Sequence, residues 1–228
     1  MNTLFLADLE KILIVAIILL TVMSVSRRNL ISLINTYSVQ SFVLSLVIFL
    51  IFLEENKSVL LYIALLTLVS KCLFIPIILK RTQKSMKIYV DLQYNLFGQT
   101  TSIFMSLIIF GVLFFSFLEI KEQLHLSSLN YIIIILGLSM ILIGMLIIIA
   151  RKKIITKIIG YLMMENGVVL LSIFIGDLPL LIEILILIDL LVLLAIISVL
   201  GFGMDSSIEN FHAKLNPFRK WFKKVSEE

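Results

Sequence analysis

Long, continuous hydrophobic stretches follow one another along the chain, separated by short polar or basic segments. A helix needs about 20 apolar residues to cross the hydrocarbon core of a membrane. Seven stretches approach or reach this length: Leu4–Val25, Leu33–Leu53, Ser58–Leu79, Leu96–Leu118, Leu129–Ala150, Thr156–Ile175 and Pro179–Phe202. Their apolar residues are continuous rather than alternating, which favours helices over membrane β-strands. The pattern predicts an all-α integral membrane protein with seven transmembrane helices.

The composition agrees with this prediction and limits the chemistry of the chain. Hydrophobic residues make up 61% of the sequence and charged residues 15%, against about 45–50% and about 25% in soluble proteins. Cys72 is the only cysteine, and both histidines, His125 and His212, fall outside the apolar stretches. One thiol cannot hold an iron–sulfur cluster, which takes about four cysteines, and two membrane histidines for a haem are lacking. We therefore expect no cofactor within this chain.

Basic residues are distributed very unequally between the two sides of the predicted membrane. Of the 19 Lys and Arg residues, 15 fall in segments that the seven helices place on one side, 3 fall on the other, and Lys71 lies within a helix. Short cytoplasmic loops are enriched in Lys and Arg. The split predicts a multi-pass protein of the cytoplasmic (inner) membrane, with its N-terminus outside and its C-terminus in the cytoplasm.

The basic tail after Phe202 contains a second amphipathic pattern, NPFRKWFKKV. Asn216 suits a helix cap and Pro217 the first helical position. Phe218, Trp221 and Phe222 then fall on one face, with basic residues on the rest. This predicts a short cytoplasmic helix lying on the anionic membrane surface; a frayed basic tail is the alternative.

The sequence resembles itself when it is shifted by 124 residues. Arg27 then meets Arg151, Tyr37 meets Tyr161, and the boundaries of the hydrophobic stretches coincide without a gap. A duplicated three-helix unit explains this, and chance similarity between basic hairpins is the alternative. Because one helix separates the two units, the repeats would be parallel. The predicted divisions are 1–79 for the first repeat, 80–127 for a cytoplasmic loop and linking helix, 128–203 for the second repeat and 204–228 for the tail.

Four ionisable residues fall within the predicted helices: Lys71, Glu165, Glu183 and Asp189. A charge at the centre of a bilayer costs about 2.5–3.5 kcal/mol on insertion scales, so such groups normally face protein or water and have partners. Lys71, Glu165 and Asp189 lie near the middle of their stretches, whereas Glu183 is closer to the outer edge. A lysine alternating with carboxylates is the minimum required for a proton relay. We therefore predict that these residues form a proton or ion pathway.

The neighbours of two of these residues strengthen or weaken that prediction. Pro76 removes a helical hydrogen bond and leaves a carbonyl near Cys72 without its partner, close to Lys71. Glu165 is followed by Asn166, a polar neighbour, and by Gly167, which allows close helix approach. The structural alternatives are a Lys71 that snorkels or forms a purely structural ion pair, and a Glu165 that only hydrogen-bonds a neighbouring helix.

The second three-helix unit resembles the small K-type subunit of respiratory complex I and its relative in multisubunit sodium/proton antiporters. The shared features are the basic turn ARKKIITK, the second-helix acid Glu165 and a third-helix acid, Glu183 or Asp189. The first unit has no acid at the place that matches Glu165, because Ser41 stands there. The resemblance implies that Glu165 and one of the two later acids take part in ion movement.

The whole chain is more specifically similar to the component E family of hydrogenase-4, found in formate-hydrogenlyase-type membrane-bound nickel–iron hydrogenases. The similar segments include LLTLVSKCLFIPIILKR, GYLMMENGVVLL and LIEILILIDLLV. The resemblance implies a non-catalytic subunit between antiporter-like and quinone-site-like membrane subunits. The nickel–iron centre and the iron–sulfur clusters would then lie in a peripheral hydrogenase arm. Alternatives are an antiporter subunit, a self-sufficient small carrier and a structural spacer.

Overall fold

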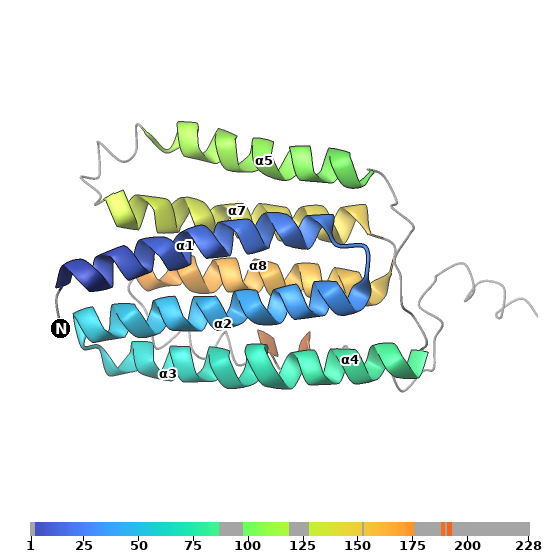
Figure 1. Cartoon of the computed structure of the whole chain (residues 1–228), viewed down its shortest axis with the longest axis horizontal. Coiled ribbons are helices and arrows are strands. Elements are labelled where there is room, and N and C mark those ends of the chain that lie inside the picture. Colours follow the sequence, from blue (N-terminus) through green and yellow to red (C-terminus); the bar gives the residue numbers. More distant parts are fainter. Residues whose placement is uncertain are drawn as a thin grey trace, which may run out of the picture.

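The computed structural model describes residues 3–86, 98–118, 128–151, 153–175, 188–189 and 191–192, and within these ranges the chain folds as a bundle of helices (Figure 1). The longer elements, in chain order, are α1 (Thr3–Ser26), α2 (Leu30–Glu55), α3 (Ser58–Leu66), the π-helical segment η1 (Thr67–Phe74), α4 (Ile75–Met86), α5 (Gln99–Ser116), α7 (Ser128–Ala150) and α8 (Ile154–Ile175). Helices α3, η1 and α4 follow one another without a break.

Five helices of the described part are long and apolar enough to cross a membrane, and the chain is a membrane-embedded protein. They cover Asp8–Ser26, Leu30–Glu55, Ser58–Lys84, Asn130–Ala150 and Ile154–Ile173. These five correspond to the first, second, third, fifth and sixth predicted stretches. The fourth, predicted over Leu96–Leu118, is the shorter helix α5. The seventh stretch lies outside the described residues except for 188–189 and 191–192, as do Glu183 and the tail 204–228.

The sequence encodes sharp ends for α2. Asn29 precedes the helix in an extended conformation, and its side chain accepts a hydrogen bond of 3.0 Å from the backbone N–H of Ile31. Asn56 follows the helix with a φ of 56°, the left-handed conformation that asparagine tolerates well. The turns on either side of α2 are therefore short, and α1 and α3 both pack against it.

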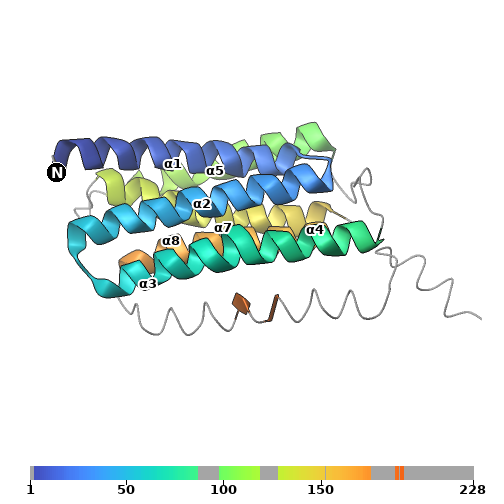
Figure 2. The ribbon, with the colours of Figure 1, turned by 60° about the horizontal axis from the view of Figure 1, so that its bottom comes forward.

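Helices α1 and α7 run in the same direction, and so do α2 and α8 (Figures 1 and 2). The α1–α2 turn, the α7–α8 turn and the end of α4 all lie at one end of the bundle, and α1 begins at the other. These three segments contain many of the basic residues of the sequence, including Arg27, Arg28, Lys84 and Arg151. The described helices thus have a basic end, as the loop pattern predicts.

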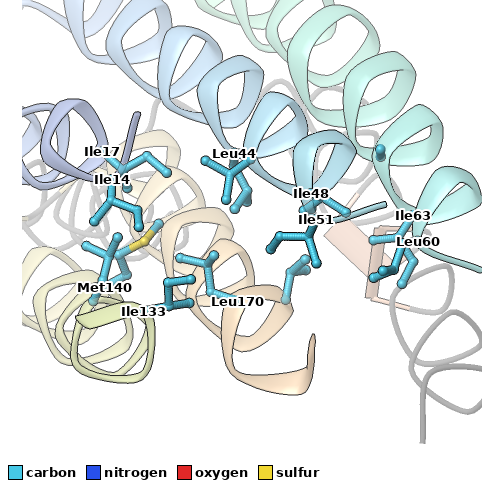
Figure 3. Packing of buried hydrophobic residues seen from close by; sticks show 14 residues of the cluster. Ile14, Ile17, Leu44, Ile48, Ile51, Leu60, Ile63, Ile133, Met140 and Leu170 are labelled. Atoms are coloured by element: carbon cyan, nitrogen blue, oxygen red, sulfur yellow. The ribbon is translucent and has the colours of Figure 1, made fainter. Parts of the chain in front are cut away.

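An apolar cluster among the described residues joins α1, α2 and α3 with α7 and α8 (Figure 3). Ile17 of α1, Leu44 and Ile48 of α2, Met140 of α7 and Leu170 of α8 are each at most 3% exposed within it. Many other large apolar side chains on these helices face outward. An apolar exterior around an apolar core is the arrangement required of helices in lipid, where packing rather than a hydrophobic effect holds them together.

Candidate functional site: a buried charge cluster between helices

The third membrane helix changes its winding in the middle, at η1. Within this π-helical segment the N–H of Ile75 bonds to the carbonyl of Ser70, five residues back. Pro76 has no N–H, so a carbonyl one turn earlier loses its helical partner. The carbonyl of Cys72 instead accepts a hydrogen bond of 2.8 Å from the hydroxyl of Ser38 on α2. Proline thus replaces an internal bond of the helix with a bond to a neighbouring helix.

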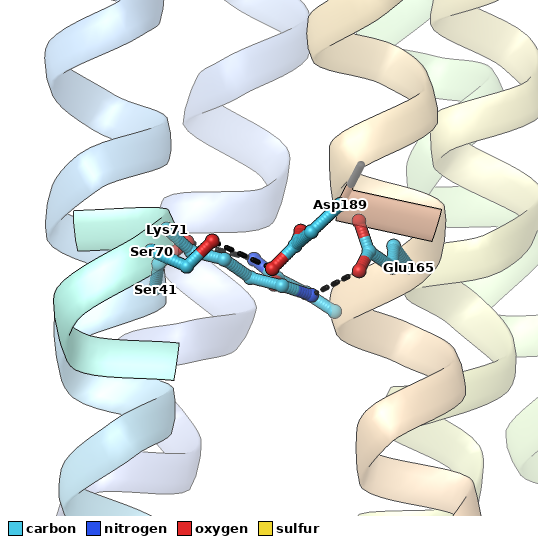
Figure 4. A network of polar contacts seen from close by, with 6 residues as sticks. Ser41, Ser70, Lys71, Glu165 and Asp189 are labelled. Atoms are coloured by element: carbon cyan, nitrogen blue, oxygen red, sulfur yellow. Dashed lines mark hydrogen bonds and ion pairs between the residues drawn. The ribbon is translucent and has the colours of Figure 1, made fainter. Parts of the chain in front are cut away.

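Lys71 lies in η1 and forms an ion pair with Glu165 of α8. Lys71 Nζ is 2.8 Å from Glu165 Oε1, and the two side chains are 0% and 2% exposed. The pair connects the third membrane helix with a helix almost a hundred residues further along the chain. Charges at this depth need partners, and each of these two residues supplies the opposite charge that the other needs. Figure 4 shows the two side chains pointing toward each other between the helices.

Ser70, the residue before Lys71, binds the other mid-helix acid. Its hydroxyl donates a hydrogen bond of 2.6 Å to Asp189 Oδ2. Asp189 is half-buried, and its carboxylate also interacts electrostatically with that of Glu165. In Figure 4 the Lys71 ammonium and the carboxylates of Glu165 and Asp189 converge on one place. Two successive residues of η1 therefore hold two acids from different parts of the chain.

Polar contacts continue from this cluster sideways through the bundle. Asn166, next to Glu165, donates a hydrogen bond of 3.0 Å to Ser41 Oγ on α2. Gln40, next to Ser41, donates one of 2.7 Å to Thr21 Oγ1 on α1. All four side chains are buried. Helices α8, α2 and α1 are thus joined by polar side chains inside an otherwise apolar interior.

Several buried oxygen atoms of the cluster have no hydrogen-bond partner within the described ranges. They include Glu165 Oε2, Asp189 Oδ1 and Asn166 Oδ1. Tyr37 of α2 is fully buried nearby and interacts electrostatically with both carboxylates. Native proteins leave few buried polar atoms unsatisfied, and those that exist mark bound water, an ion or a functional role. The cluster therefore has unused capacity to accept hydrogen bonds or a cation.

The structure brings together three of the four ionisable residues singled out in the sequence: Lys71, Glu165 and Asp189. The fourth, Glu183, lies outside the described residues. The sequence did not point to Ser70 or Ser41, since single serines in apolar stretches are common and carry no pattern. A signal was nevertheless present, because Ser70 directly precedes Lys71 and Ser41 matches Glu165 in the repeat.

Other kinds of site are less supported by the described residues. Within those ranges, His, Cys, Asp and Glu side chains do not gather in groups of three or more that could hold a metal ion. A buried ion pair beside a further acid suits the storage or transfer of a proton better than covalent catalysis. Comparisons with protein families, with curated proteins and with solved structures found no match for this chain.

Proposed function

We propose that this chain is a non-catalytic membrane subunit of an energy-converting redox complex, and that it contributes to a proton or ion pathway coupled to electron transfer. The observation that carries the proposal is the Lys71–Glu165 ion pair, fully buried in a membrane-embedded bundle, with Asp189 beside it. A charged cluster at this depth is costly, and ionisable groups inside membrane proteins usually mark ion or proton pathways.

The finer architecture belongs to the same proposal. Seven transmembrane helices arranged as two parallel three-helix repeats agree with the common direction of α1 and α7 and of α2 and α8. A cytoplasmic location of the basic end agrees with the positive-inside rule. The partner complex suggested by the resemblance is a membrane-bound nickel–iron hydrogenase, with antiporter-like and quinone-site-like membrane subunits around this one. The metal centres would belong to the peripheral arm.

Two other functions use the same charges differently. A subunit of a sodium/proton antiporter would have the ion pathway but no redox partner. A structural spacer would keep the ion pair only to hold η1 against α8. The unpartnered carboxylate oxygens favour a functional cluster over a spacer, since a purely structural network is best fully satisfied.

The first experiment identifies the subunits that bind to this chain in the membrane. The chain is extracted from its native membrane in mild detergent through a C-terminal tag, and the bound subunits are identified by mass spectrometry with nickel and iron analysis. Stoichiometric metal together with a hydrogenase large subunit supports the redox complex. Antiporter subunits without metal support the ion-exchange alternative, and a solitary chain contradicts the proposal.

Replacing Lys71 tests the ion pathway. Lys71→Ala leaves Glu165 buried without its cation, and we expect loss of at least nine-tenths of coupled ion transport, measured in membrane vesicles driven by the electron donor of the complex. Lys71→Arg keeps a permanent positive charge beside Glu165, so we expect assembly with most of the coupling retained. Lys11→Ala is the matched control, because Lys11 pairs with Asp8 at 3.0 Å on the surface. An assembled Lys71→Ala complex with full coupling would contradict the proposal.

Removing both charges at once distinguishes a pathway from a spacer. The double variant Lys71→Met, Glu165→Gln keeps side chains of similar size and removes both members of the buried ion pair together, which leaves Asp189 as the only acid of the cluster. If the pair only supports the fold, this complex assembles and couples normally. If the pair carries ions, the complex assembles and coupling is lost.

A further inference from the structure

The buried cluster contains one cationic group and two acids. Lys71 is paired with Glu165 at 2.8 Å. Asp189 is held by Ser70, whose neutral hydroxyl donates a hydrogen bond but supplies no charge. With all three groups ionised, the cluster has one surplus negative charge. A basic side chain that would balance this charge is not found beside it among the residues that the structure describes.

A surplus charge at this depth is not a stable resting state. The side chains of Lys71 and Glu165 are 0% and 2% exposed, and Asp189 is half-buried. Burying an unpaired charge is strongly unfavourable, and titratable groups respond by changing their protonation. The remaining titratable groups near the acids, Tyr37 of α2 and Cys72 of η1, are a phenol and a thiol, which supply no compensating cation. Neutrality therefore requires one additional cation in the cluster.

The free oxygen atoms show where this cation can bind. Glu165 Oε2 and Asp189 Oδ1 have no hydrogen-bond partner within the described ranges, and they belong to two carboxylates that interact with each other. Two neighbouring carboxyl groups commonly share one proton. A sodium ion at this position would lie beside the Lys71 ammonium and be repelled by it, whereas a proton forms a bond between the two acids. The geometry favours a proton.

We propose that Glu165 and Asp189 share one exchangeable proton, so that the cluster is electrically neutral when loaded and has one negative charge when unloaded. The proposal rests on the proposed ion pathway and specifies its cargo and its binding groups. Lys71 is the fixed cation that keeps the second acid from taking up a proton of its own. Ser70 is a positioning residue, because it orients Asp189 through Oδ2 and leaves Oδ1 for the shared proton.

The proposal predicts how many protonated carboxyl groups the cluster holds in each variant. Infrared difference spectroscopy of the purified protein with its companions, recorded across pH and after hydrogen–deuterium exchange, measures the carboxylic acid band. We expect one protonated carboxyl in the native cluster and none after Glu165→Gln or Asp189→Asn, since either change leaves a single acid for Lys71. Lys71→Met is expected to give two, because both acids must then be neutral.

Two controls keep the counting unambiguous. Glu10 is a buried acid on α1, 2% exposed, and Glu10→Gln must leave the cluster's band unchanged even if it removes a separate one. Ser70→Ala preserves every charge, so it is expected to shift the band without changing its area. Circular dichroism and size-exclusion chromatography show whether each variant is folded. If the charge variants do not fold, the Ser70→Ala shift alone tests the assignment.

Three results would contradict the proposal that Glu165 and Asp189 share a proton. The first is a native cluster with no carboxylic acid signal below neutral pH. The second is a signal lost in only one of the two acid variants. The third is a native signal that sodium removes and potassium leaves unchanged, which would make sodium the cargo. The count requires no coupling and no metal centre, so it can succeed when the proposed redox complex fails, and it can fail when that complex is correct.

Discussion

The α1–α2 hairpin and the α7–α8 hairpin have the same direction and a similar basic turn, yet they pack in different ways. In α7–α8 the two backbones touch: a Cβ added to Gly144 would lie 2.6 Å from the carbonyl oxygen of Gly160, and one added to Gly167 would lie 2.5 Å from that of Gly137. The positions that match these four glycines in α1–α2, 124 residues earlier, are Leu13, Leu20, Thr36 and Val43. Helices α1 and α2 accordingly approach each other over a smaller part of their length than α7 and α8 do.

This difference shows how the protein supports a buried acid. Glu165 lies between Gly160 and Gly167, on the part of α8 that packs directly against the backbone of α7. Helices in lipid associate through van der Waals packing, and small residues allow the closest contact. The second hairpin is therefore a firm support for the acid. The first hairpin has Ser41 at the matching position and contributes uncharged polar contacts.

Replacing a glycine of the second hairpin by the residue found in the first should have the largest effect on the free energy of unfolding. Gly144→Leu copies the residue found at position 20, and its side chain would meet Met164 and the backbone of Gly160. Overpacking costs about 1–3 kcal/mol and occasionally more, and a clash with backbone belongs at the upper end, so we expect a loss of about 3 kcal/mol or more in the free energy of unfolding, measured by denaturant titration in mixed micelles.

The matched control for this change is Gly111→Leu on α5. A Cβ at Gly111 meets nothing within 4 Å, so a larger side chain there should be accommodated. Equal destabilisation by the two substitutions would show that the close contact of α7 and α8 does not distinguish the hairpins.

Arg27 and Arg151, which occupy matching positions in the two hairpins, provide the second test of the difference between them. Arg151 is 2% exposed, and its Nη2 donates to the carbonyls of Val25 at 2.9 Å and Arg27 at 2.7 Å, at the end of α1. Arg151→Met leaves those carbonyls without this donor, and we expect a loss of about 2 kcal/mol by the same titration. Arg27 itself is half-buried, so Arg27→Met should cost less than half as much. A reversed order would contradict the asymmetry.

Removing the hydrogen bond between Asn166 and Ser41, which joins the two hairpins, should have the smallest effect on stability. Ser41→Ala removes the acceptor for Asn166, and hydrogen bonds between membrane helices contribute about 0.6 kcal/mol on average. A double-mutant cycle of Ser41→Ala with Asn166→Ala should give a coupling energy of that size. A coupling energy near zero would indicate that this hydrogen bond does not help to hold the two hairpins together.

Much of this architecture could be predicted from the sequence. The hydrophobic stretches located five membrane helices to within a few residues at most of their ends, and Pro76 indicated a carbonyl in need of a new partner near Cys72. Gly167 was correctly expected at a close helix contact. These features depend on composition over a turn or more of one helix, which is why a single sequence reveals them.

The contacts across helices could not be predicted in the same way. The ion pair of Lys71 with Glu165 and the bond of Ser70 to Asp189 depend on how far apart the helices lie and how each is rotated. The π-helical winding of η1 places both residues, and no pattern of apolar residues specifies it. The sequence identified the charged residues, whereas their arrangement results from tertiary packing.

The winding of η1 also has a consequence for comparing related chains. A π-helical turn contains more residues than an α-helical one, and such turns are commonly single-residue bulges in an α-helix. Deleting one residue between Thr67 and Phe74 would therefore allow a continuous α-helix in which α3 and α4 keep their faces. It would change the direction of the side chains inside the segment, including those of Ser70 and Lys71. A relative with a one-residue gap in this segment would keep every hydrophobic stretch and still lack the cluster. In an alignment, that gap would separate chains able to form the charge cluster from those that only share the fold.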